Sequence, residues 1–172
     1  MGTGTDIAAR TPGDGLRWAA LSAIVLAVLA IDQALKESVR SNFDPGEGTH
    51  LFGSYSIHYV QNFGVAGGGL EARALPLAVL AMMAVLGLYE LLARYSHARV
   101  SLLIGFGLLI GGGLGNLVDR ARFGFVTDFI RNGPNAFNIA DIAIFAGGII
   151  VLVGLVASVL RMRMRQPTSN GA

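Results

Sequence analysis

Four uninterrupted apolar runs dominate the hydrophobic pattern of the chain. They cover residues 18–31, 74–89, 100–118 and 142–160. The last two runs contain 19 residues each, and at about 1.5 Å of rise per residue such a helix is about 28 Å long, close to the roughly 30 Å hydrocarbon core of a bilayer. The first two runs reach that length only if their helices include Asp32 or Glu90. The pattern therefore predicts an integral membrane, all-α protein with four transmembrane helices.

The segment between the first two apolar runs has a different period. Tyr55, Ile57, Tyr59 and Gln61 alternate with other residues over seven positions, and a period of two is typical of a strand. The residues 62–64, Asn-Phe-Gly, then form a predicted turn. We therefore expect a small extracytoplasmic β-sheet between helices 1 and 2, within about residues 45–70.

The distribution of arginine predicts the orientation, because cytoplasmic flanks are rich in Lys and Arg. Arg94 and Arg99 flank the short loop between the second and third spans with no acid between them, and three arginines follow the last run. We therefore expect both termini in the cytoplasm and the two longer loops outside. The predicted organisation is a disordered N-terminus over residues 1–15, one four-helix membrane domain over residues 16–161, and a basic cytoplasmic tail over residues 162–172.

An alternative for the first run is a cleaved signal peptide. Basic residues precede the run, and Val28-Leu29-Ala30 is a plausible cleavage site. Asp32 and Lys36 favour a helix that continues through this point instead.

The composition supports a membrane protein and excludes several kinds of chemistry. Hydrophobic residues make up 53% of the chain and charged residues 14%, against roughly 25% charged in a typical soluble domain. The chain has no cysteine, which excludes a disulfide scaffold, a thiol nucleophile and a cysteine-ligated metal. The net charge of +2 gives no indication of nucleic-acid binding.

Two rows of residues with a spacing of four lie in the third apolar run and just beyond it. The first row is Gly107, Gly111 and Gly115, a small-residue pattern that most simply indicates close packing between helices. The second row is Gly112, Asn116 and Arg120. Asn116 and Arg120 therefore share a helical face and can reach the same ligand. For the adjacent Asp119, a structural ion pair or a helix-end hydrogen bond is the simpler interpretation.

Two further acids lie where an acid is costly. Asp128 interrupts the apolar, β-prone stretch 126–130, and a carboxylate at membrane depth costs about 2.5–3.5 kcal/mol, which makes it a functional candidate. Asp141 lies three residues after Asn138 at the start of the last run, a spacing that also fits a capping box. Gly133 lies in the segment between the two acids, so the chain can fold back and bring the carboxyl groups together.

Two carboxyl groups in contact share one proton, because both cannot ionise. One can then activate a water as general base while the other polarises a carbonyl. This is the chemistry of an aspartic peptidase. The His-Glu-x-x-His, Gly-x-Ser-x-Gly and Gly-x-Gly-Asp signatures of other peptidases do not occur in the sequence.

Five short blocks, in this order, resemble the lipoprotein signal peptidases (signal peptidase II), which are four-span aspartic peptidases of bacterial membranes. The blocks are residues 32–36, 62–66, 111–120, 126–130 and 137–141, and the resemblance covers about residues 17–160. The chain departs from the family pattern after Ala66, where Gly67-Gly68-Gly69 replaces an aromatic and a small residue, and in the short segment between the two acids. Neither change removes a catalytic group.

The resemblance implies an endopeptidase that removes the signal peptide from diacylglyceryl-modified prolipoproteins, cutting just before the lipidated cysteine. It implies that Asp128 and Asp141 are catalytic, and that no metal or other cofactor is needed. The implied substrate-binding residues are Asn62, Gly112, Asn116, Arg120 and Asn138. The implied supporting residues are Asp32, Lys36 and Asp119. We expect a monomer in the bacterial cytoplasmic (inner) membrane, with its active site toward the extracytoplasmic side, in contact with prolipoproteins and membrane lipids and not with nucleic acid.

Two other classes of function remain open from the residues. A small transporter or proton-relay subunit could use Asp128, Asp141 and Arg120 to bind an ion, although the sequence has no inverted repeats or paired broken helices. A membrane scaffold could use the glycine-rich face of the third run. That interpretation leaves the two isolated acids unexplained.

Overall fold

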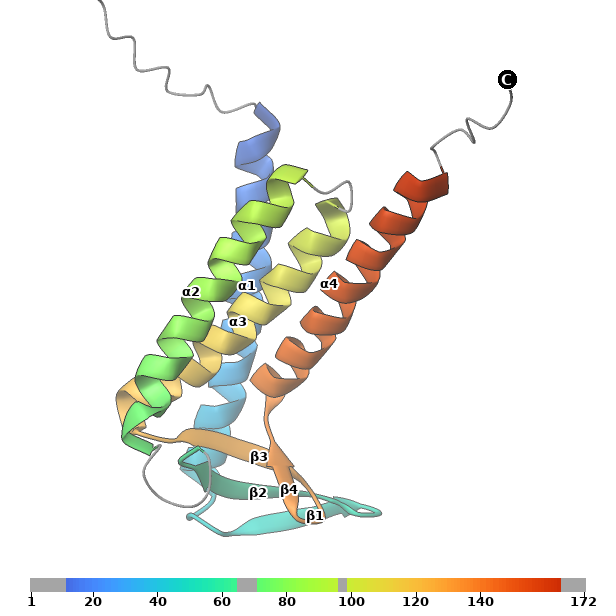
Figure 1. Ribbon diagram of the computed structural model, residues 1–172. Coiled ribbons are helices and arrows are strands. Elements are labelled where there is room, and N and C mark those ends of the chain that lie inside the picture. The colour runs from blue at the N-terminus through green and yellow to red at the C-terminus, as the bar shows by residue number, and fades with distance from the viewer. Residues whose placement is uncertain (1–11, 65–70, 96–98, 165–172) are drawn as a thin grey trace, which may run out of the picture.

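The computed structural model describes residues 12–64, 71–95 and 99–164, which form four long helices and one small sheet (Figure 1). The helices are α1 (Pro12–Asn42), α2 (Glu71–Tyr95), α3 (Arg99–Phe123) and α4 (Ile139–Met164). The strands are β1 (Gly48–Phe52), β2 (Tyr55–Asn62), β3 (Val126–Asn132) and β4 (Asn135–Phe137). The predictions for residues 1–11, Gly67–Gly69 and 165–172 lie outside the described residues.

Three of the described helical segments are long and apolar enough to cross a membrane, namely Gly15–Asn42, Val100–Phe123 and Ile139–Met164. The apolar segment of α2 is shorter and covers Ala78–Tyr89. The protein is therefore a membrane protein with three to four membrane-spanning helices. α1 begins at Pro12, earlier than the predicted domain boundary at residue 16, and α4 continues to Met164.

α3 lies at the centre of the bundle and contacts each of the other three helices (Figure 1). Glycines make these contacts close. A Cβ atom at Gly107 would lie 2.7 Å from Ile24 Cγ2, and one at Gly111 would lie 2.8 Å from Val28 Cβ, both on α1. The predicted close packing along the first glycine row is therefore confirmed.

The apolar core has two parts. The larger cluster fills the space between the helices and consists of Leu21, Tyr89, Leu102, Phe106, Ile110 and Val151. The smaller cluster consists of Val39, Tyr59 and Phe129, and it joins the end of α1 to the sheet. The second cluster thus fixes β2 and β3 against the helical bundle.

The sheet is antiparallel with the order β1-β2-β3-β4. The strand predicted from the period of two is confirmed as β2, which pairs with β3 through Val60 and Asp128. The predicted location between helices 1 and 2 was wrong for half of the sheet, because β3 and β4 connect α3 to α4. The first four residues of β3 are all buried, so no polar alternation reveals this strand in the sequence.

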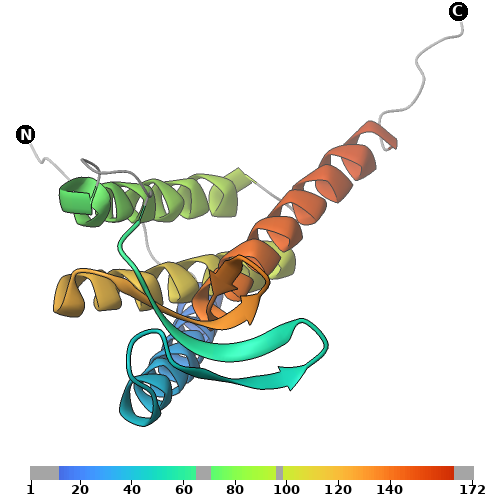
Figure 2. The ribbon, with the colours of Figure 1, turned by 90° about the horizontal axis from the view of Figure 1, so that it is seen from below.

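The start of α1 and the end of α4 lie at one end of the bundle, and the sheet lies at the other (Figure 1). Seen from the sheet end, the strands lie near the ends of α1 and α3, while α2 lies apart from them (Figure 2). The predicted site residues on α1, α3, β3 and α4 therefore gather at the end of the bundle that carries the sheet.

Candidate active site

Asp128 and Asp141 come from different elements and are linked by one asparagine. Asp128 lies on β3 and is 2% exposed, whereas Asp141 lies in the first turn of α4 and is partly exposed. Asn138 donates from Nδ2 to Asp128 Oδ1 at 2.6 Å, and its backbone N–H donates to Asp141 Oδ2 at 3.2 Å. The structure thus brings the two predicted catalytic acids to one site.

Each carboxylate oxygen of Asp128 accepts a hydrogen bond. Asn62 Nδ2 donates to Oδ2 at 2.8 Å, opposite the bond from Asn138 to Oδ1. The pKa of Asp128 is raised to about 6, mainly by burial and also by the negative charge of Asp141, while the two asparagine bonds and the charge of Lys36 oppose the rise. A carboxyl group with this pKa exchanges its proton near neutral pH, which suits an acid–base catalyst.

Asn138 and Asp141 also form the predicted capping box at the start of α4. The backbone N–H of Asp141 donates to Asn138 Oδ1 at 3.0 Å, which completes the reciprocal pair of bonds. The other carboxylate oxygen of Asp141, Oδ1, accepts from Asn116 Nδ2 at 2.8 Å. Capping therefore holds the carboxyl group of Asp141 in one orientation and leaves part of the side chain exposed.

A buried charge cluster lies behind the two aspartates. Lys36 Nζ is 2.9 Å from Asp32 Oδ2 and 3.3 Å from Asp119 Oδ2, and all three side chains are fully buried. Lys36 also donates to Asn116 Oδ1 at 2.8 Å. Because the oxygen of Asn116 faces the lysine, its Nδ2 faces Asp141. Lys36 thus orients the amide that holds Asp141.

Asp32 and Asp119 connect this cluster to the elements that carry Asp128 and Asp141. Asp32 Oδ1 accepts from the backbone N–H of Ala140 at 3.0 Å, at the start of α4. Asp119 Oδ2 accepts from the backbone N–H of Thr127 at 2.9 Å, next to Asp128. The predicted interpretation of Asp119 as a structural ion-pair residue is confirmed by its ion pair with Lys36.

Gly112 and Arg120, predicted with Asn116 to bind substrate, occupy different environments. Gly112 is buried, and a Cβ atom there would contact the carbonyl oxygen of Ala140 and lie 3.0 Å from Ile144 Cγ1. It therefore lets α3 approach the start of α4. Arg120 is partly buried, and its side chain makes no hydrogen bond or ion pair with the residues that the structure describes. The binding roles of both residues stay predictions.

The sequence analysis did not identify three polar residues that contact this network. Gln33 Nε2 donates to Asp119 Oδ1 at 3.2 Å and to the carbonyl oxygen of Gly115 at 3.1 Å. Arg40 NH1 donates to Thr127 Oγ1 at 2.8 Å. The sequence did contain an indication for Arg40, because it follows Asp32 and Lys36 at a spacing of four residues and so lies on the same helical face. Thr127 has no comparable signal in the sequence.

The arrangement offers two carboxyl groups with different environments beside a partly exposed surface. Such a pair can take a proton from water and give one to a carbonyl or an amine. Among residues 12–64, 71–95 and 99–164, no three His, Cys, Asp or Glu side chains are grouped so that they could hold a metal ion.

Comparisons with known proteins identify the family of the chain. The family model described as signal peptidase (SPase) II matches residues 24–157. A lipoprotein signal peptidase of Moorella thermoacetica is 42% identical over 134 residues, which are 74% of this chain and 87% of the relative. A lipoprotein signal peptidase of Shewanella oneidensis is 36% identical over 149 residues, which are 80% of this chain and 85% of the relative.

Two solved structures share the fold. Both are described as bacterial membrane enzymes determined by the in meso method, at 2.3 and 1.9 Å resolution, with TM-scores of 0.70 and 0.67. The first is 22% identical, with 88% of this chain and 94% of that chain covered. The second is 23% identical, with 78% and 91% covered. With the family match over most of its length, this chain belongs to the signal peptidase II family, the proteases of lipoprotein processing.

Proposed function

We propose that this chain is an aspartic endopeptidase that uses Asp128 and Asp141 to remove the signal peptide of diacylglyceryl-modified prolipoproteins, just before the lipidated cysteine. The observation that carries the mechanism is the shared asparagine, Asn138, which bonds to both carboxyl groups. The substrate class is supported by the relatives named lipoprotein signal peptidase and by the five sequence blocks.

In this mechanism Asp128 carries the proton. Its burial and the charge of Asp141 favour the protonated form, in keeping with its pKa of about 6. Protonated Asp128 donates a hydrogen bond to the scissile carbonyl oxygen, while ionised Asp141 takes a proton from a water. The water oxygen attacks the carbonyl carbon and forms a tetrahedral intermediate. Proton transfer to the amide nitrogen then releases the amine of the cysteine and the new carboxylate of the signal peptide.

The neighbouring polar residues have distinct tasks in the proposal. Asn62, Asn116 and Asn138 hold the two carboxyl groups through their Nδ2 atoms. Arg120 contacts the substrate, since its side chain has no polar partner within the described part of the chain. Gly112 keeps α3 close to the start of α4, so that Asn116 reaches Asp141.

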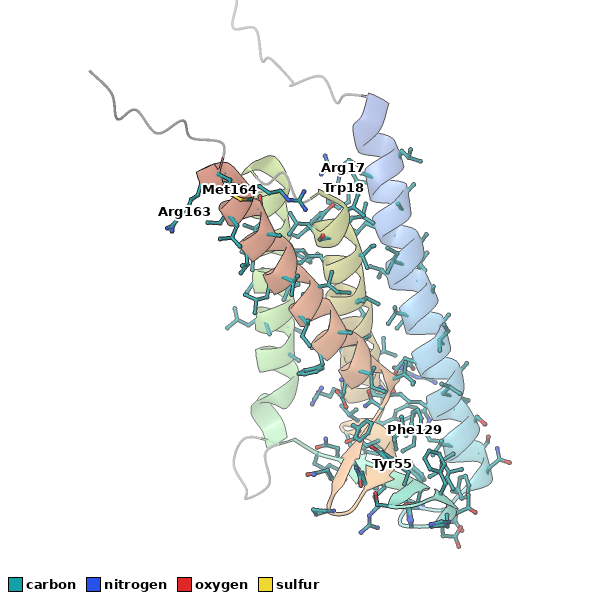
Figure 3. The ribbon with its side chains drawn as sticks, turned by 90° about the vertical axis from the view of Figure 1, so that its right-hand side faces the viewer. Arg17, Trp18, Tyr55, Phe129, Arg163 and Met164 are labelled. Atoms are coloured by element: carbon teal, nitrogen blue, oxygen red, sulfur yellow. The ribbon has the colours of Figure 1, made fainter. Side chains whose placement is uncertain are left out.

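We also propose the orientation predicted from arginine. Arg17 and Arg163 lie at the end of the bundle opposite Tyr55 and Phe129 (Figure 3). The positive-inside rule places this end in the cytoplasm. The site then lies at the extracytoplasmic end, where water is available and exported precursors arrive. The protein is a monomer of the bacterial inner membrane in this proposal, with apolar residues of α4 such as Phe145 and Leu152 facing lipid.

The test is cleavage of a purified diacylglyceryl-modified prolipoprotein by the wild-type protein, by Asp128→Asn and by Asp141→Asn. Removal of a general acid or base costs about 10²- to 10⁴-fold in rate, so both variants should lose at least about 100-fold in kcat. Asp44→Asn changes an exposed loop aspartate and should keep wild-type turnover. An unmodified precursor should not be cut. Near wild-type turnover of either site variant would refute the catalytic pair, and cleavage of the unmodified precursor would refute the substrate class.

A further inference from the structure

We infer that Arg40 is a positioning residue for Asp128 and acts through the hydroxyl group of Thr127. The inference rests on the proposed catalytic role of Asp128. Arg40 lies near the C-terminal end of α1, and Thr127 directly precedes Asp128 on β3. The hydrogen bond from Arg40 NH1 to Thr127 Oγ1 is 2.8 Å long.

The guanidinium group of Arg40 is held from several sides. Its side chain is 11% exposed, and its NH1 is 3.4 Å from Asp119 Oδ1. Its Cζ lies 4.6 Å from the centre of the Phe123 ring, a cation–π distance. Its NH2 donates to Glu37 Oε2 at 2.9 Å. Because α1 and α3 both hold the guanidinium group, it gives Thr127 a fixed partner.

Thr127 is bound at each of its polar atoms. Its N–H donates to Asp119, its hydroxyl oxygen accepts from Arg40, and its carbonyl oxygen accepts from Asn138 Nδ2 at 3.4 Å. The residue is fully buried. The strand therefore has little freedom to rotate at this position.

Because Thr127 and Asp128 are adjacent on β3, fixing the orientation of Thr127 also fixes that of Asp128. Successive side chains of a strand point to opposite faces, so a rotation of β3 that moved the hydroxyl of Thr127 would turn the carboxyl group of Asp128 as well. The same rotation would displace the carbonyl oxygen bonded to Asn138, which also holds Asp128. Arg40 therefore sets the direction of the catalytic carboxyl group without touching it.

The kinetic test compares Thr127→Val, Thr127→Ser and Arg40→Met with the wild type on the lipid-modified prolipoprotein. Valine matches threonine in shape but lacks the hydroxyl, so kcat should fall about tenfold while KM stays within about twofold, since small misplacements of catalytic groups mainly cost rate. Serine keeps the hydroxyl and should restore kcat to within about twofold. Arg40→Met/Thr127→Val should be no slower than Arg40→Met, because both changes break the same bond.

Thr49→Val is the matched control, since Thr49 is exposed on β1 and the variant should keep wild-type kcat. Near wild-type kcat in Thr127→Val, or losses that multiply in the double variant, would overturn the inference. The inference would also be overturned if the kcat of Thr127→Val fell no more than its folded fraction, as measured by thermal unfolding.

A second readout does not depend on activity. Hydrogen exchange in peptides that cover residues 125–132 should accelerate about tenfold in Arg40→Met, because β3 is freed locally, while peptides of β1 stay unchanged. Unchanged exchange over β3 would overturn the inference. If Asp128→Asn stays active while β3 exchange responds as expected, the proposed function fails and the positional role of Arg40 stands.

Discussion

Replacement of Lys36 by methionine tests whether the buried charge cluster holds the site together. Lys36 is the only lysine of the chain, and it is fully buried between Asp32 and Asp119. Methionine has a similar length but carries no charge. In Lys36→Met, two buried carboxylates would lose the cation that they share, and Asn116 would lose one of the two donors to its Oδ1 atom, keeping the bond from Asn138.

The expected loss is about 3–5 kcal/mol in the free energy of unfolding, the usual cost of removing one partner from a buried ion pair. The double variant Asp32→Asn/Lys36→Met should recover about half of this loss. Replacement of a whole buried pair by neutral groups is often nearly neutral. Asparagine also keeps an oxygen that can accept from the N–H of Ala140, and Asp119 keeps its ion pair with Arg40.

The assay is reversible denaturant unfolding of the purified protein in mixed lipid–detergent micelles, with cleavage activity measured in parallel. Arg163→Met is the control, because Arg163 is exposed near the end of α4 and surface changes usually stay within about 0.5 kcal/mol. A loss below about 1 kcal/mol in Lys36→Met would refute the reasoning. A double variant less stable than Lys36→Met would refute it as well, because the cost would then not arise from unpaired carboxylates.

Three further predictions concern Asp128 and the close packing around the site. The pKa of Asp128 is raised from 3.8 to about 6, so the folded state binds this proton more tightly than the unfolded state. The free energy of unfolding should therefore fall by about 3 kcal/mol as the pH rises from about 4 to above 6. Denaturant unfolding of Asp128→Asn over the same pH range should lack this decrease. Asn62→Leu removes a hydrogen bond that lowers the pKa of Asp128, so the decrease in the free energy of unfolding should extend to higher pH than in the wild type. An unchanged pH midpoint of this decrease would contradict the role of Asn62 in lowering the pKa. Gly115→Ala places a Cβ against the carboxylate of Asp32 and should cost about 1–3 kcal/mol by thermal unfolding, whereas Gly148→Ala meets no atom within 4 Å and should not destabilise.

The sequence pattern was enough to predict the helices and to single out Asp128 and Asp141. Long apolar runs predict membrane helices because few other arrangements satisfy the backbone in lipid. Asp128 and Asp141 were identifiable because an acid in an apolar stretch is costly. Their proximity was a prediction from the intervening turn residues, and the structure places both against Asn138.

The sheet and the role of Arg40 were harder to predict. β3 is buried along its first four residues, so it lacks the alternation that identified β2, and the pairing of Val60 with Asp128 depends on residues 68 positions apart. Arg40 lies nine residues beyond the end of the first apolar run, and the apolar pattern does not reveal that α1 continues to Asn42. Both cases depend on long-range contacts, which local patterns do not encode.

The glycines of α3 show that packing and function need not be alternative interpretations of one motif. Gly115 lies against the carboxylate of Asp32, and Gly112 lies against the carbonyl oxygen of Ala140. A side chain at either position would push α1 or the start of α4 away from α3, and the bonds from Ala140 to Asp32 and from Asn116 to Asp141 would lengthen. Buried charges are tolerated only when they are paired and hydrogen-bonded at close range. Close helix packing is therefore the condition that makes the buried charge cluster, and through it the arrangement of Asp128 and Asp141, energetically possible.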